Sequence, residues 1–208
     1  QTCALPIFLS KEYYCAEVVN LETKAVRTVK DNLKEIAAGE EEACEKLMYA
    51  LVLSGLAMQM TGNSRPASGA EHHLVHLWDM EVVNGHLDAL HGEKVSAGTM
   101  LVLLEYKKIA DAIRKGNCKV HTCTEEDREL LQSTFGKKGI LGAIEKENTP
   151  ELLDDVSTKE LSDTLPGILK IIDALPAVTD MQEMMNTAGC VSRVRDIGLP
   201  GEVIEESL

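Results

Sequence analysis

Between residues 10 and 38 the apolar side chains recur at steps of three and four residues. The series consists of Tyr14, Val18, Leu21, Ala25, Val29 and Leu33. This spacing places them on one face of a helix, and Gly39 stands where a glycine commonly ends one. No stretch of useful length alternates apolar and polar residues, as a half-buried strand would. We therefore predict an all-α protein with the architecture of a helical bundle.

The helical pattern continues along the rest of the chain. Aromatic residues, which favour strands, make up only 3% of the sequence. We expect further helices over residues 41–60, 70–83 and 95–114, and shorter ones that begin near Thr124 and Thr149 and that cover residues 162–174 and 180–187.

Charge and cysteine content exclude several classes of protein. The formal net charge of -13 argues against a nucleic-acid partner, because phosphate groups repel an acidic chain. The longest mainly apolar run, residues 47–60, is too short and too polar to span a bilayer, so we expect no membrane partner.

The six cysteines lack paired spacing and no secretory signal is evident, which favours a cytoplasmic location. We interpret the cluster of Cys118, His121 and Cys123 as incidental, because no second pair of ligands accompanies it.

Three histidines have the spacing of a metal site. His72 and His76 are four residues apart on an expected helix and therefore face the same way, while His73 points elsewhere. His91 lies near the start of the next helical segment, so two helices can direct imidazoles at one point. Neutral imidazole is a common ligand of divalent metals. From spacing alone, the alternative is that surface histidines fall close together by coincidence.

The sequence motifs around these histidines indicate a particular protein family more specifically than the spacing does. The segment GNSRPASGAEHHLVHLWDM, followed by LHGEKVSAGTMLVLLEY, resembles the sn-glycerol-1-phosphate dehydrogenase family, in particular its bacterial type. This family is part of the iron-type alcohol dehydrogenase and glycerol dehydrogenase superfamily. The resemblance extends over residues 8–208, which we expect to form one helical metal- and substrate-binding domain. Residues 1–7 are expected to be non-native, since QTCALPI matches the translation of a common sequencing adapter.

The resemblance implies the C-terminal metal-binding domain of a dehydroquinate synthase-like or iron-type alcohol dehydrogenase fold. Enzymes of this family reduce dihydroxyacetone phosphate to glycerol 1-phosphate. A divalent metal ion, which could be zinc, nickel or iron, polarises the substrate oxygen. NAD(P)H supplies the hydride from an N-terminal nucleotide-binding domain, and no GxGxxG loop occurs in this sequence. Full-length relatives are expected to be homodimers.

By motif position, the resemblance assigns His72 and His91 as metal ligands and His76 as a substrate-binding residue. The family's third ligand is an aspartate that would precede the first residue of this chain, so one ligand is expected to be absent. A site with three ligands that lacks one binds metal weakly. We therefore predict that the 208-residue chain is inactive by itself.

Other residues near the histidines allow two interpretations each. Asn63, Ser64 and Arg65 precede a helix and could bind the substrate phosphate, or they could hold the loop together. Glu71 and Glu93 could orient the metal-binding imidazoles, or they could be solvated acids at helix ends. We interpret Lys94 as a surface lysine and Trp78 as a core residue, and neither as part of the site.

Two other functional hypotheses remain open. One is another superfamily member, such as a glycerol dehydrogenase or a dehydroquinate synthase-like lyase, against which the SRPASGAEHH block argues. The other is a non-enzymatic helical module in which the histidines are structural.

Overall fold

The computed structural model describes residues 14–120, 125–147, 149 and 156–208. Within these ranges every regular element is a helix, which confirms the predicted all-α class. The longer helices are α2 (Ala16–Asp31), α4 (Glu41–Thr61), α5 (Ala70–Asp79), α6 (His91–Arg114), α7 (Glu125–Phe135), α9 (Thr158–Asp173) and α10 (Val178–Thr187). The shorter pieces are α3 (Leu33–Ala37), η1 (Gly136–Lys138), α8 (Leu141–Glu147), η2 (Val194–Ile197) and α11 (Gly201–Ser207).

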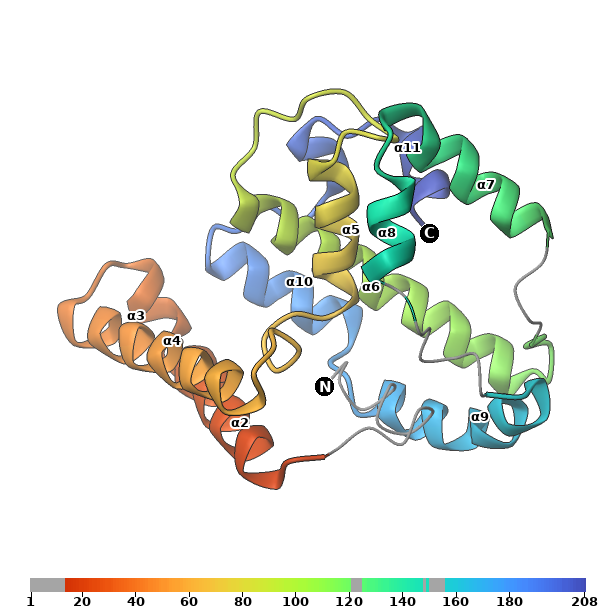
Figure 1. Ribbon diagram of the computed structural model, residues 1–208. Helices are drawn as coiled ribbons and strands as arrows, with labels where there is room; N and C mark the ends of the chain where they lie inside the picture. Colours follow the sequence, from red (N-terminus) through yellow and green to blue (C-terminus); the bar gives the residue numbers. More distant parts are fainter. Residues whose placement is uncertain (1–13, 121–124, 148, 150–155) are drawn as a thin grey trace.

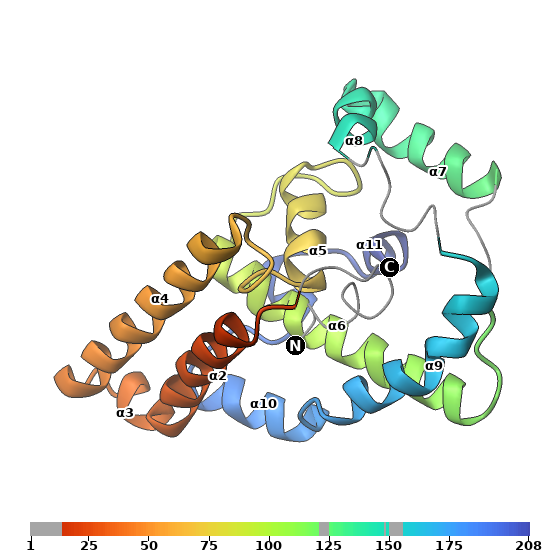
Figure 2. The same ribbon diagram turned by 60° about the horizontal axis from the view of Figure 1, so that its bottom comes forward.

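Helix α6 runs through the middle of the molecule (Figure 1). It contacts α5, α9, α10 and η2. Figure 2 shows α2 and α4 side by side at one edge, with α7 and α8 at another. The described helices contain no segment long and apolar enough to cross a bilayer.

The buried side chains form separate clusters. The largest joins α5 and α6 to η2 and α11, and its most enclosed members include Trp78 and Val75. The Trp78 indole Nε1 donates to Ser207 Oγ at 3.0 Å, which ties the last helix to α5. Trp78 is therefore a core residue, as predicted. A second cluster lies between α2 and α4, and a third lies between α6 and α9.

Three of the differences between predicted and observed helix boundaries can be traced to single residues. The first expected helix is divided at Asn32, whose φ of -120° and ψ of 22° are not helical. The Asn32 amide donates to the Thr28 carbonyl at 2.8 Å, so the side chain satisfies a helix-end acceptor. Helix α5 ends at Asp79 instead of residue 83, because Glu81 adopts a left-handed φ of 53°.

The third difference concerns the start of α6, which begins at His91 and not near residue 95. Glu93 stands at the third helical position, and its Oε2 accepts from the backbone N–H of Leu90 at 2.8 Å. This bond satisfies a donor at the helix entrance and extends α6 by one turn. His91 is thereby fixed on the first turn of a long helix. The helix expected near Thr124 is present as α7 from Glu125, although Thr124 itself falls outside the described residues, as do residues 1–7, His121 and the residues that directly follow Thr149.

Candidate metal and substrate site

Three imidazole rings converge where α5 passes the first turn of α6. The ring centroids of His72 and His76 are 6.4 Å apart, and His91 lies 5.7 Å from His72 and 6.1 Å from His76. The structure therefore brings together the three histidines that the spacing predicted to converge. His73, one residue off this face, is exposed.

Carboxylates contact the Nδ1 atoms of two of these rings. His72 Nδ1 lies 3.0 Å from Glu71 Oε1, and His91 Nδ1 lies 3.3 Å from Asp79 Oδ2. Glu71 Oε1 also accepts from the backbone N–H of Gly69 at 2.8 Å, which holds the carboxylate at the entrance of α5. With Nδ1 bound to a carboxylate, Nε2 is the nitrogen left for a ligand. Glu71 thus lies where we expected a residue that orients His72.

Asp79 was not identified from the sequence, and Glu93 was expected in its place. The carboxylate of Glu93 is bonded to the backbone of Leu90, whereas Asp79, at the end of α5, reaches His91. A signal was present, because Asp79 follows His72 by seven residues and therefore lies on the same face of the helix. The contact could not be predicted, because the conformation of the eleven residues between α5 and α6 determines which carboxylate lies beside His91.

Lys94 is a second correction. We expected a surface lysine, but the residue is only 9% exposed, and its Nζ donates to Asp79 Oδ1 at 2.7 Å. Burial is the largest influence on the pKa of Asp79 and acts to raise it. The hydrogen bonds and charges of Lys94 and His91 together outweigh burial, so the pKa of Asp79 is lowered. Asp79 is therefore a carboxylate at neutral pH, and it joins α5 to α6.

The geometry of His72 and His91 can be compared with that of a metal site. Two imidazoles that bind one tetrahedral ion at about 2 Å hold their ring centroids roughly 5 Å apart. The observed 5.7 Å is near this separation. Among the described residues, no group of three or more His, Cys, Asp or Glu side chains is arranged to hold a metal ion. The separation of these two rings is thus compatible with a shared ion, whereas the described residues do not complete its ligand set.

The residues proposed to bind phosphate lie in the loop before α5. Asn63, Ser64 and Arg65 are exposed. The Asn63 side chain accepts from the backbone N–H of Arg65 at 3.1 Å, and the Ser64 carbonyl accepts from Ala67 and Ser68. These hydrogen bonds agree with the interpretation that the three residues hold the loop together. The side chains are also accessible from solvent.

The site rests on a close approach of its two helices. A Cβ atom at Gly98 of α6 would lie 3.3 Å from the backbone carbonyl oxygen of Glu71 and 3.7 Å from Val75 Cγ2. The absence of a side chain at Gly98 therefore lets α6 pack closely against the first turn of α5, which carries Glu71 and His72. Beneath the histidines, Val75 and Trp78 are fully buried and fix the rotation of α5.

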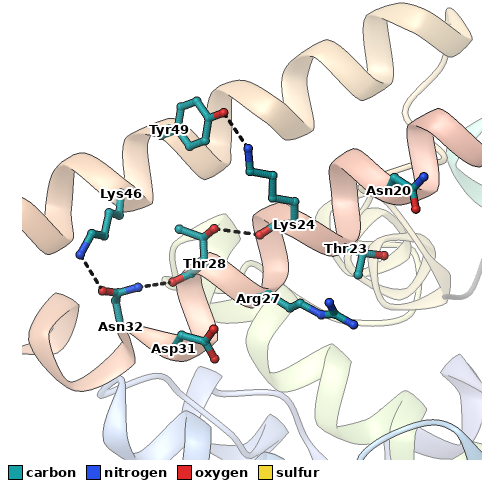
Figure 3. Close-up of a pocket in the computed structure, with 9 residues that line it drawn as sticks. All are labelled: Asn20, Thr23, Lys24, Arg27, Thr28, Asp31, Asn32, Lys46 and Tyr49. Carbon is teal, nitrogen blue, oxygen red and sulfur yellow. Dashed lines mark hydrogen bonds between the residues drawn. The ribbon is translucent and has the colours of Figure 1, made fainter.

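A pocket away from the histidines lies between α2 and α4 (Figure 3). Some of its polar groups bond to one another: Lys24 Nζ donates to the Tyr49 hydroxyl at 3.2 Å, and Lys46 Nζ donates to Asn32 Oδ1 at 3.1 Å. The sequence had marked none of these residues. Both lysine ammonium groups already have acceptors within the chain, and we assign no function to this pocket.

Comparison with known proteins supports the predicted resemblance. The chain is 32% identical over 201 residues to a protein of Halalkalibacterium halodurans, and 28% identical over 202 residues to one of Geobacillus stearothermophilus. Both relatives are named glycerol-1-phosphate dehydrogenase (NAD(P)+), as is a Pyrococcus horikoshii protein that is 36% identical over 110 residues.

These matches cover a larger share of this chain than of its relatives. The two bacterial matches cover 96% and 97% of this chain but 42% and 43% of the relatives, so the chain spans less than half of their length. The Pyrococcus match covers 51% of this chain and 31% of that relative. No family model matches the chain. No solved structure matches it either.

Proposed function

We propose that this chain, which is homologous over nearly its whole length to the glycerol-1-phosphate dehydrogenases, is the helical metal- and substrate-binding domain of such an enzyme. The domain would comprise residues 8–208. The enzyme would reduce dihydroxyacetone phosphate to sn-glycerol 1-phosphate. The observation that carries the proposal is the convergence of His72, His76 and His91, within sequence blocks that predicted the family.

The contacts of the three histidines suggest a different role for His76 than for His72 and His91. His72 and His91, each with a carboxylate on Nδ1, would bind the metal through Nε2. His76 shares no such carboxylate contact among the described residues, and its exposed ring borders both of the others. These features suit a residue that contacts substrate.

The bound metal would supply a Lewis acid beside the substrate oxygen, and NAD(P)H would supply the hydride. Glu71 would hold the His72 imidazole in orientation through its fixed carboxylate. Asn63, Ser64 and Arg65 would bind the phosphate group from the loop before α5. We also propose a cytoplasmic location and a homodimeric full-length enzyme.

Metal binding tests the ligand assignment. Zn²⁺, Ni²⁺ and Fe²⁺ are titrated separately into the metal-free chain, and the dissociation constants are measured by calorimetry. His72→Ala and His91→Ala should each weaken binding at least tenfold. His73→Ala is the matched control, because this exposed neighbour lies off the shared face. Equal loss in all three variants would refute the assignment.

Turnover tests the reaction. A gene product that contains this sequence together with a nucleotide-binding domain is supplied with dihydroxyacetone phosphate and NADH or NADPH, and His76→Ala is expected to raise KM. Preference for unphosphorylated dihydroxyacetone would favour a glycerol dehydrogenase instead.

A further inference from the structure

Asp79 contacts both residues that α6 presents to the end of α5. Its Oδ1 accepts from Lys94 Nζ at 2.7 Å, and its Oδ2 lies 3.3 Å from His91 Nδ1. His91 and Lys94 are three residues apart and therefore lie on one side of the first turns of α6. A single carboxylate thus joins the two helices beside the histidine cluster.

We infer that Asp79 is a positioning residue that holds the His91 imidazole in its Nδ1–H tautomer and leaves the Nε2 lone pair free to bind a metal ion. Two nitrogens compete for the one proton of a neutral imidazole, and an acceptor beside Nδ1 decides the competition. Asp79 Oδ2, which lies 3.3 Å from Nδ1, is such an acceptor. This inference rests on the proposed metal-binding function, although the tautomer itself is a property of the metal-free chain.

Lys94 gives Asp79 its fixed place. A buried ammonium group is costly unless it is paired, and Asp79 is the carboxylate paired with it here. The ion pair anchors Oδ1 and so restricts the carboxylate to orientations in which Oδ2 faces His91. Lys94 therefore acts on the histidine through Asp79.

The other acid of this turn is already occupied. Glu93 Oε2 bonds to the backbone N–H of Leu90, which leaves Asp79 as the carboxylate on the His91 ring. The contact between Glu71 and His72 has the same form, at 3.0 Å. Both candidate ligands therefore have an acid at Nδ1, supplied in one case by a sequence neighbour and in the other by a different helix.

The test measures the tautomer directly. The ¹⁵N chemical shifts of His91 are recorded on the metal-free chain above the pKa of imidazole, with and without Asp79→Ala. The wild-type chain should show a protonated Nδ1 and an unprotonated Nε2. The variant should move toward the Nε2–H form and should weaken Zn²⁺ binding about 10- to 100-fold. Asp88→Ala, which removes an exposed carboxylate three residues before His91, should leave both quantities unchanged.

A second variant guards against loss of folding. Asp79→Asn keeps the size of the side chain, but its amide can donate to Nδ1 as well as accept from it, so His91 should show mixed tautomers. Unchanged ¹⁵N shifts in a folded variant would overturn the role of Asp79, whether or not Zn²⁺ binds. A changed tautomer in a chain whose wild type binds no Zn²⁺ would support the positioning role and refute the proposed metal site.

Discussion

The contribution of Asp79 to the free energy of unfolding should depend on pH. Its pKa is lowered from 3.8, because bonds and charges from Lys94 and His91 outweigh the effect of burial. A carboxyl group with a lowered pKa stabilises the fold above its unfolded pKa, and this contribution is lost as pH falls through the folded pKa. We expect Asp79→Asn to be less stable than wild type at pH 7, by a margin that shrinks below about pH 4. Urea denaturation at pH 7, 5 and 3 measures the margin, and a constant margin would contradict this account.

Gly98 sets the distance between the two helices that bear the histidines. A side chain there would meet the backbone of Glu71, so Gly98→Val should destabilise the fold by about 1–3 kcal/mol. Gly55→Val is the matched control, because no heavy atom lies within 4 Å of a Cβ placed at this position in α4. Urea denaturation compares the two variants. Equal losses would mean that the effect comes from the change of residue type and not from the helix contact.

The sequence predicted those parts of the site that depend on local spacing. His72 and His76 follow from a four-residue step, and Glu71 reaches His72 as its neighbour. Asp79 and Lys94 could not be assigned in this way, because their contact joins residues that are 15 positions apart across an irregular loop. The roles of these residues in catalysis stay predictions.

At the scale of elements, helical periodicity predicted where most helices lie but not where each one starts and ends. Boundaries depend on single bonds, such as the one from Asn32 to the Thr28 carbonyl that divides α2 from α3. The start of α6 likewise depends on Glu93. Pro166 lies inside α9 without ending it, so a breaker in the sequence need not mark a boundary.

Helix α4 has one buried face and one exposed face, although both are apolar. Leu53 is 6% exposed and packs against α2, whereas Leu56 is 45% exposed. We expect Leu53→Ala to lower the free energy of unfolding by about 2–4 kcal/mol and Leu56→Ala to lower it by less than about 1 kcal/mol. The two variants make the same chemical change on one helix, so urea denaturation isolates the effect of burial. Equal costs would contradict the burial pattern of α4.

At the scale of the whole molecule, the core is divided. The cluster between α2 and α4 consists of Ala25, Ala50 and Leu53, with partly buried Leu21 and Val29 around it. The cluster around α5 and α6 contains Trp78 and draws residues from both η2 and α11. Among the described residues, α3, which links α2 to α4, contacts α10. The α2–α4 unit therefore has fewer and smaller buried groups to hold it in place.

Local opening follows the amount of apolar surface that an element buries. We expect the amides of α2 and α4 to exchange hydrogen at a lower free energy of opening than those of α5 and α6, by at least about 1 kcal/mol. Native-state hydrogen exchange at increasing denaturant concentration resolves the two groups. Leu53→Ala should lower the opening free energy of α2 and α4 while the local opening of α6 stays the same. If all four helices instead open together in the wild type, the separate clusters act as one cooperative core, and the division seen in the packing has no energetic counterpart.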